Sequence, residues 1–307
     1  MGIYDRNFYN EASAQKLGWL PQWFGAQEVG EELVKRVKHF QKEHNLVSDG
    51  LVGPVTFRRA FTELEARGAL LKKEAMQEPP DDNIKFYITC SGQPVEIEWE
   101  KVVGLRHEHS LALSSGCYER ALNYERKPSM IVTHWDAALS ASSCKKILER
   151  RGLSSHFVID NDGTIYQMVD TNNVAWHAGS VANKTSIGID FSNAFYTKYQ
   201  KVYRKRGFGN RPLLKSKVHG ANLGEHLGYY PAQLDAYKAL IKALTSHYQI
   251  PLECPVDEVG DLLTVVHKDS VRGAFKGVVC HYHLSRKKID CAGLELKSLL
   301  DDIKTNY

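Results

Sequence analysis

Three side chains that bind zinc well lie far apart in this sequence, each close to an apolar run. His134 follows the run at residues 130–133, His281 follows the run at residues 277–280, and Cys291 comes soon after. A catalytic zinc ion takes three protein ligands and leaves one position open for water. The pattern therefore predicts the site of a zinc hydrolase, which only folding can assemble.

Composition sets the bounds for this prediction. A chain of 307 residues with 43% hydrophobic and 25% charged residues is typical of a soluble globular protein with one to three domains. The net charge of +4, without a dense basic block, is too weak to indicate nucleic-acid binding. No run reaches the roughly 18 apolar residues of a membrane span, and the first residues do not resemble a signal peptide. We expect synthesis in the cytoplasm, no stable membrane insertion and a monomer.

The six cysteines are too few for a disulfide scaffold in a chain of this length, so we expect reduced thiols. Cys291 differs from the others because it follows the polar and basic run at residues 285–288. Nearby cations favour the thiolate, which is the form that binds metal.

The chain divides into a helical part and an α/β part. Residues 29–64 predict two helices separated by a turn at 45–50, with Pro54 at an early position of the second helix. The charged block at 63–82 ends in Pro79-Pro80-Asp81-Asp82 and predicts a helix tail followed by a linker. We expect a helical domain at 1–78, a linker with accessory strands at 79–127 and a catalytic domain at 128–307.

Short apolar runs dominate after residue 84. They predict strands at 85–89, 95–99, 129–134, 155–160, 164–169 and 186–191, helices at 140–151 and 231–248, and a hairpin turn at 160–163. Residues 195–230 and 251–276 have no clear period and predict irregular insertions. The expected fold is α/β, with a mixed central sheet flanked by helices, preceded by a small three-helix domain.

Five ordered segments carry a resemblance to a known family. Residues 131–135, 155–167, 175–179, 186–190 and 278–281 resemble the zinc-dependent N-acetylmuramoyl-L-alanine amidases, which include phage lysozyme-type amidases and peptidoglycan recognition proteins. Independently, residues 34–61 resemble the small three-helix peptidoglycan-binding domain. The two resemblances imply the same substrate.

The amidase resemblance implies a Zn²⁺ cofactor held by His134, His281 and a third ligand. Relatives use either Cys or Asp as the third ligand, which leaves Cys291 and Asp290 as candidates. We choose Cys291, because a thiolate binds zinc more tightly than a carboxylate does. His283 competes with His281, since both would share one face of a strand.

The resemblance also implies residues around the metal. Asp190 stands where the amidases carry an acidic catalytic residue, usually Glu. The catalytic Lys of the family sits two residues before the third ligand; counted from Cys291 that position is Ile289, so Lys288 lies one residue out of place. His177 and Trp176 match the groove residues that contact substrate.

These implications predict a function. We expect hydrolysis of the amide bond between N-acetylmuramic acid and L-alanine of bacterial peptidoglycan, by a phage endolysin that acts on the cell wall after holin-type release from the host cytoplasm. The alternatives are a non-catalytic peptidoglycan-recognition protein and a cytosolic amidase that recycles muropeptides. The presence of Cys291 argues against the first alternative, and the wall-binding module argues against the second.

Overall fold

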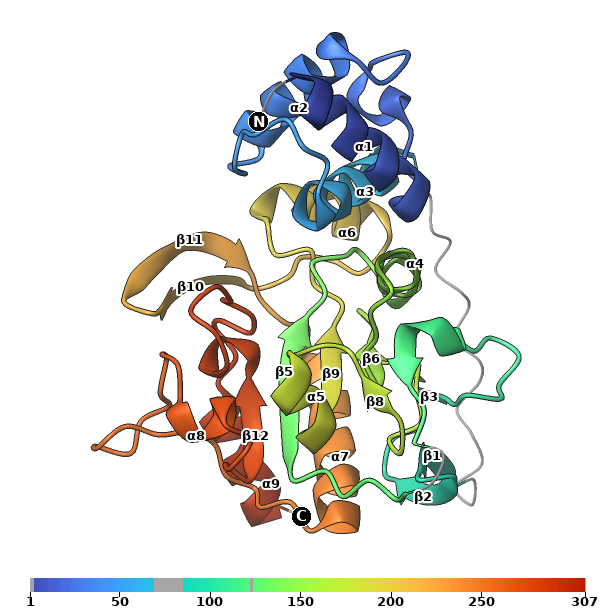
Figure 1. The fold of residues 1–307 in the computed structure, drawn as a ribbon. Coiled ribbons are helices and arrows are strands. Elements are labelled where there is room, and N and C mark those ends of the chain that lie inside the picture. The colour runs from blue at the N-terminus through green and yellow to red at the C-terminus, as the bar shows by residue number, and fades with distance from the viewer. Residues whose placement is uncertain (1–2, 69–84, 122–123, 307) are drawn as a thin grey trace. The chain divides into compact units, whose positions relative to one another are not determined.

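The computed structural model describes residues 3–68, 85–121 and 124–306, which form two compact units (Figure 1). The first unit comprises Met1–Leu70 and Lys146–Arg151, and the second comprises Leu71–Lys145 and Gly152–Tyr307. The predicted boundary between residues 78 and 79 lies outside the described residues, as does most of the charged block at 63–82. The three predicted domain limits therefore stay a prediction.

The first unit is helical. It contains α1 (Ile3–Leu17), a 3₁₀ turn η1 (Pro21–Phe24), α2 (Glu31–Glu43) and α3 (Pro54–Gly68). The sequence predicted α2 and α3, which bury apolar side chains such as Leu33, Val37 and Phe57. Helix α1 was missed because its apolar residues do not gather on one face.

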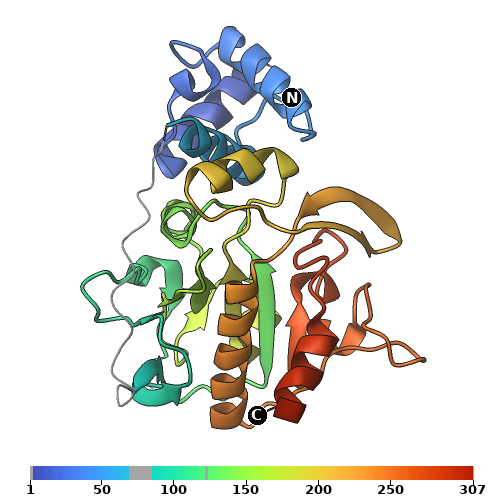
Figure 2. The ribbon, with the colours of Figure 1, turned by 180° about the vertical axis from the view of Figure 1, so that it is seen from behind.

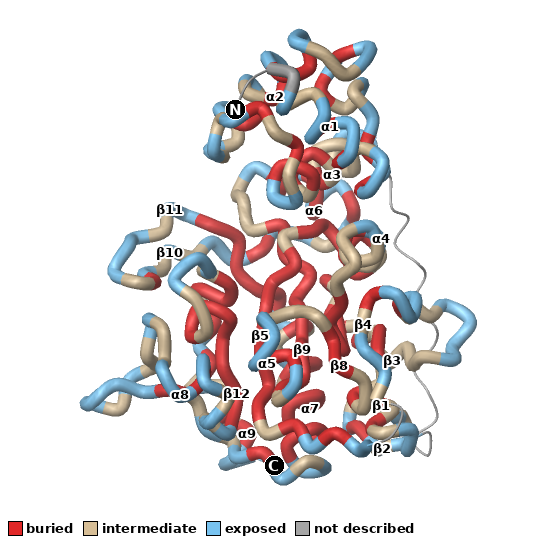
Figure 3. Tube along the Cα trace, in the orientation of Figure 1, coloured by how far each residue is buried: buried red, intermediate tan, exposed pale blue. Residues whose placement is uncertain are grey.

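A mixed sheet forms the centre of the second unit and confirms the predicted fold class. Its six strands lie in the order β12 (Gly277–Cys280), β5 (Met130–Trp135), β9 (Ser186–Phe191), β6 (Phe157–Ile159), β7 (Ile165–Gln167) and β3 (Val102–Val103). The first four are parallel neighbours, whereas β6 and β7 form the predicted antiparallel hairpin. Every residue of β5 and β9 is buried, as expected for parallel strands that are covered on both faces (Figure 3).

Helices cover the two faces of this sheet. Helix α7 (Pro231–Tyr248) lies on one face with α9 (Leu296–Asn306) beside it, and α5 (Ser180–Thr185) lies on the opposite face (Figures 1 and 2). Thr133 of β5 bonds to Tyr237 of α7, with its Oγ1 2.7 Å from the phenolic oxygen. Because side chains alternate along a strand, His134 points to the face opposite α7.

Smaller elements surround the sheet. The hairpin of β1 (Phe86–Cys90) and β2 (Gln93–Ile97) matches the predicted accessory strands, and β4 (Tyr118–Glu119) pairs with β8 (Val174–Ala175). The helix predicted at 140–151 is α4 (Ala141–Arg151). Among the described residues, no helix is long and apolar enough to cross a bilayer.

The insertion at 195–230 is more ordered than the sequence predicted. It contains η3 (Thr197–Tyr199), α6 (Gln200–Lys205) and a hairpin of β10 (Leu213–Val218) and β11 (Ala221–Leu227). The hairpin strands are exposed along most of their length. Their sequence therefore has no alternation of apolar and polar residues from which strands could be predicted. The insertion at 251–276 is irregular as predicted, apart from α8 (Lys268–Val271).

The turn between β6 and β7 depends on Gly163. Its φ is +84°, and a Cβ atom there would lie 2.6 Å from the carbonyl oxygen of Ala232. We expect Gly163→Ala to lower the free energy of unfolding by about 2–4 kcal/mol, combining left-handed strain with a backbone clash. Denaturant unfolding measures this loss. Gly152→Ala is the matched control, because Gly152 also has a positive φ of +61° but its Cβ would meet nothing within 4 Å. Equal losses in both variants would contradict the role given to the clash.

Candidate metal and catalytic site

Parallel pairing brings three of the predicted site residues to one edge of the central sheet. His134 of β5 lies opposite Asp190 of β9 in register, and His281 directly follows β12, the other neighbour of β5. The carboxyl ends of parallel strands meet at the same edge, which is where α/β proteins bind their ligands. Three segments distant in sequence therefore contribute side chains to one place.

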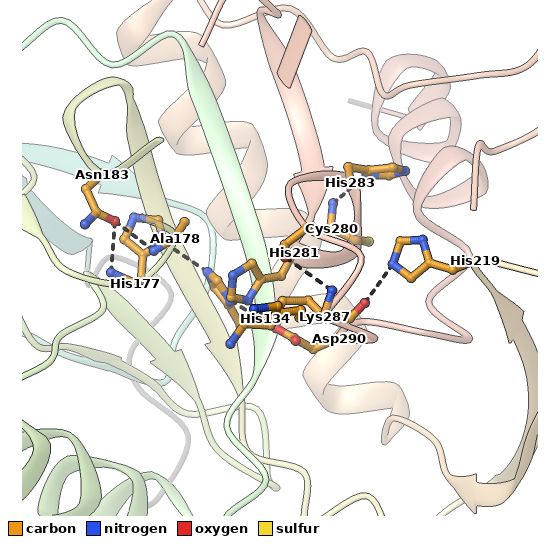
Figure 4. Close-up of polar contacts among 12 residues, drawn as sticks. His134, His177, Ala178, Asn183, His219, Cys280, His281, His283, Lys287 and Asp290 are labelled. Carbon is orange, nitrogen blue, oxygen red and sulfur yellow. Dashed lines mark hydrogen bonds and ion pairs between the residues drawn. The ribbon is translucent and has the colours of Figure 1, made fainter. Parts of the chain in front are cut away.

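Three donor atoms converge there (Figure 4). His134 Nδ1 lies 2.9 Å from His281 Nδ1 and 3.1 Å from an Asp290 carboxylate oxygen, and that oxygen lies 2.9 Å from His281 Nδ1. Among the described residues, these three form the group of His, Cys, Asp and Glu side chains whose geometry could hold a metal ion.

The donor set fits zinc. Two imidazole nitrogens and one carboxylate oxygen are ligands of catalytic zinc, and tetrahedral bonds of about 2.0–2.1 Å place neighbouring donors about 3.3 Å apart. The observed separations of 2.9–3.1 Å are close to this value. Three donors leave a fourth position for water or substrate.

The structure does not bring Cys291 to this cluster. Its side chain is fully buried in the apolar core, where its thiol is within hydrogen-bonding reach of Cys280 and Tyr229. Burial raises the pKa of the Cys291 thiol well above 9, which disfavours the metal-binding thiolate. Asp290, the alternative third ligand, faces the histidines instead.

The sequence suggested that His281 and His283 share one face of a strand, but in the structure they do not. Strand β12 ends at Cys280, and the two histidines lie on the 3₁₀ turn η4 (His281–His283), where residues two apart point in different directions. His283 is engaged elsewhere: its Nδ1 accepts a hydrogen bond from the Cys280 N–H at 3.0 Å, and its Nε2 bonds the Leu263 carbonyl at 2.6 Å. His281 is therefore the histidine that the fold presents to His134.

The electrostatics of the cluster suit metal binding. Burial alone would raise the pKa of the Asp290 carboxyl, but the neighbouring His281 and His134 rings outweigh it and hold that pKa well below 3.8. Burial lowers the pKa of His281 below 6.5 despite the opposing effect of Asp290. At neutral pH the carboxylate is charged and the His281 ring is neutral, which are the protonation states that metal ligands require.

Asp190 and Lys288 lie beside this group. Asp190 is buried and occupies the strand position next to His134, and the charge of Lys288 contributes to the lowered pKa of His281. Lys288 stands two residues before Asp290. This is the separation between lysine and third ligand that the amidase resemblance implies, so the lysine is out of place only when it is counted from Cys291.

The hairpin of β10 and β11 braces the loop that carries these residues, a role that the sequence analysis missed. The His219 side chain at its tip donates from Nε2 to the Lys288 carbonyl at 3.0 Å. A Cβ on Gly293 would lie 2.8 Å from Ser216 Oγ, so the hairpin packs directly against the loop. One signal could have revealed this hairpin: the His219-Gly220 pair, whose positive φ values of 54° and 81° make a two-residue turn.

His177 contacts His134 on the side of the ring that faces away from His281 and Asp290. Its Nδ1 lies 3.0 Å from His134 Nε2, and its own Nε2 lies 3.3 Å from Ser186 Oγ. Both ring nitrogens are therefore engaged within the protein, and the predicted contact of His177 with substrate stays a prediction. Trp176 is partly exposed, and its backbone N–H donates to Ser154 Oγ at 2.8 Å. The role of the Trp176 ring in binding substrate stays a prediction.

Arg126, which the sequence analysis did not single out, holds the segment around His177. Its buried guanidinium donates to the carbonyls of Thr171, Asn173 and Ser186 at 2.7, 2.5 and 2.6 Å. Burial lowers the pKa of Arg126 to about 10, so it stays charged at neutral pH. The Arg126 side chain therefore bonds to both ends of the segment that positions His177, at Thr171 and at Ser186.

Comparisons with known proteins find similar chains among solved structures. Among solved structures, a mutant endolysin from Bacillus subtilis is 19% identical over 67% of this chain and 99% of its own, with a TM-score of 0.37. The N-acetylmuramoyl-L-alanine amidase LysC from Clostridium intestinale URNW is 18% identical over 67% and 99%, with a TM-score of 0.38. A selenomethionine derivative of AmpD is 18% identical over 64% and 94%, with a TM-score of 0.37. Likeness at these values carries no information on substrate or role.

A comparison with curated proteins finds no match. The family model described as N-acetylmuramoyl-L-alanine amidase matches residues 124–287, which is more than half of the 307 residues. The match includes His134, Asp190 and His281, and it ends just before Lys288 and Asp290. The chain therefore belongs to the N-acetylmuramoyl-L-alanine amidase family and is an amide hydrolase of that class.

Proposed function

We propose that this chain hydrolyses the amide bond between the lactyl group of N-acetylmuramic acid and L-alanine with a zinc ion held by His134, His281 and Asp290. The convergence of three donor atoms at 2.9–3.1 Å carries this proposal. Zinc bound there supplies a Lewis acid, which polarises the scissile carbonyl and lowers the pKa of a bound water towards about 7.

The surrounding residues supply the proton chemistry. Asp190, beside His134 on the neighbouring strand, takes the proton from the attacking water and passes it to the leaving amine of L-alanine. The Lys288 ammonium group stabilises the negative charge that develops on the carbonyl oxygen. Support for these roles comes from the register of Asp190 with His134 and from the electrostatic effect of Lys288 on His281.

The biological role that we propose is that of a phage endolysin with an N-terminal wall-binding domain. Residues 34–61, which resemble a peptidoglycan-binding domain, fold as helix, turn and helix in the first unit. The Gln41 side chain fastens the turn by donating to Asp49 at 2.9 Å and accepting from the Gly50 N–H at 2.8 Å. A domain that holds the enzyme on an insoluble polymer serves lysis of intact walls.

Digestion of purified sacculi by the full chain tests the proposal. We expect mass spectrometry to find intact glycan strands and stem peptides with a free L-alanine amino terminus, and metal analysis to find one zinc per chain. Removal of zinc by a chelator should reduce the rate at least about 100-fold, and added zinc should restore it. Zinc binding without release of amino termini would indicate a recognition protein. Cleavage of soluble muropeptides but not of sacculi would indicate a recycling amidase.

A further inference from the structure

The His134 ring has to present one particular nitrogen to the metal. A neutral imidazole carries its proton on one nitrogen and a lone pair on the other, and only the lone pair binds a metal. In this structure His134 Nδ1 faces His281 and Asp290, whereas Nε2 faces away from them. The site therefore requires the tautomer of His134 that carries its proton on Nε2.

A chain of hydrogen bonds starts at that second nitrogen. His134 Nε2 lies 3.0 Å from His177 Nδ1, and His177 Nε2 lies 3.3 Å from Ser186 Oγ. Ser186 Oγ in turn donates to the carbonyl oxygen of Ala182 at 2.6 Å. The chain thus links the cluster to the backbone of α5 through two side chains.

The last bond sets the direction of the others. A carbonyl oxygen has no hydrogen, so the single Ser186 hydroxyl proton goes to Ala182, and Ser186 Oγ can only accept from His177 Nε2–H. In a neutral His177 ring, Nδ1 is then an acceptor, and it must receive the proton of His134 Nε2–H. His134 Nδ1 consequently keeps its lone pair for the metal.

Packing holds His177 in this position. A Cβ on Gly188 of β9 would lie 2.8 Å from His177 Cγ and Nδ1. The imidazole therefore packs directly against the backbone of the strand, at a position that only glycine leaves open. The Asn183 side-chain oxygen accepts from the backbone N–H groups of His177 and Ala178 at 3.0 and 2.7 Å (Figure 4). The acceptor that faces His134 is therefore built on a fixed segment.

We propose that His177 is a positioning residue, which fixes the tautomer and orientation of His134 through the directional chain from His134 to His177, Ser186 and the Ala182 carbonyl. This inference rests on the proposed function only because it takes zinc as the metal ion that His134 binds. Partners of this kind fix the ring of a metal-binding histidine, and their loss typically weakens metal affinity 10–100-fold.

The tautomer can be measured without metal. In the metal-free Asp290→Ala protein labelled with ¹⁵N-histidine, the carboxylate oxygen that lies 3.1 Å from His134 Nδ1 no longer competes for the ring proton. Two-bond ¹H–¹⁵N correlations of this protein at pH 8 distinguish a protonated Nε2 from a protonated Nδ1. We expect the His134 ring, assigned by comparison with His134→Gln, to carry its proton on Nε2. A proton on Nδ1 would overturn the proposal. This result does not depend on zinc binding, so it stays decisive even if the proposed metal chemistry fails.

A pair of similarly sized variants tests the effect on metal. His177→Asn keeps an acceptor oxygen near the position of Nδ1, whereas His177→Leu does not. We expect zinc affinity, measured by competition with a chromophoric chelator, to fall about 10–100-fold in His177→Leu and to stay within a few-fold of wild type in His177→Asn. The visible spectrum of the Co²⁺-substituted protein should change only in His177→Leu.

Ser155→Ala is the matched control. Ser155 Oγ is buried, would lie 3.0 Å from a Cβ on Gly188, and makes no hydrogen bond to any residue in the described part of the chain. We expect wild-type zinc affinity in this variant. Equal affinities of His177→Leu and wild type would reject the proposal, and so would equal weakening in His177→Leu and His177→Asn, because a merely structural role does not distinguish an acceptor from a methyl group.

Discussion

Asp290→Ala is expected to remove stoichiometric zinc and to lower the rate of peptidoglycan cleavage at least about 1,000-fold, because three ligands are needed to hold a catalytic zinc ion. The carboxylate oxygen of Asp290 lies 3.1 Å from His134 Nδ1 and 2.9 Å from His281 Nδ1, so its removal leaves two donors. Metal analysis and the sacculus digestion assay give the two readouts.

Cys291→Ala is the matched control for Asp290→Ala, since it changes the adjacent residue. Its thiol is fully buried in the apolar core, so we expect full zinc content and nearly full activity, with a loss of about 1–2 kcal/mol in the free energy of unfolding from the small cavity. The opposite pattern, in which Cys291→Ala loses zinc and Asp290→Ala keeps it, would restore the thiolate as the third ligand.

Asp190→Asn is expected to lower kcat about 100- to 10,000-fold with zinc content unchanged, because the amide has nearly the shape of the carboxylate but cannot take a proton from water. Asp190 lies beside His134 in the strand register without belonging to the group of three donor atoms. Asp190→Glu should keep substantial activity, since Glu is the usual residue at this position in the amidases that the sequence resembles.

Asp136→Asn is the control for Asp190→Asn. Burial raises the pKa of the Asp136 carboxyl well above 3.8, and the nearby Asp190 raises it further, so Asp136 stays protonated more readily than a solvent-exposed carboxyl does. Its Oδ1 accepts from the backbone N–H groups of Ala138 and Asn193 at 2.8 and 3.0 Å, and the single side-chain oxygen of Asn can keep both contacts. We expect a small effect on kcat. A larger loss in Asp136→Asn than in Asp190→Asn would move the base to Asp136.

Much of the catalytic unit could be predicted from local pattern. The helix expected at 231–248 is α7 with those bounds, and the strands that lead to His134 and Asp190 lie where the apolar runs placed them. Buried parallel strands have to be continuously apolar, and an amphipathic helix has to repeat its apolar face, so both leave a signal in the sequence. The hairpin of β10 and β11 left almost none, because its strands stay largely exposed.

The sequence by itself determined the class of chemistry: two histidines at the ends of apolar strands, a candidate third ligand at 290–291, and an acidic residue at the end of a neighbouring strand. Only the tertiary structure decided between near neighbours. His281 rather than His283, and Asp290 rather than Cys291, face His134. The two histidines lie on one 3₁₀ turn and point in different directions, and the Cys291 thiol is buried in the apolar core. Adjacent residues are equivalent in a sequence pattern. They differ in a fold because each side chain points either into the apolar core or to the polar edge of the sheet.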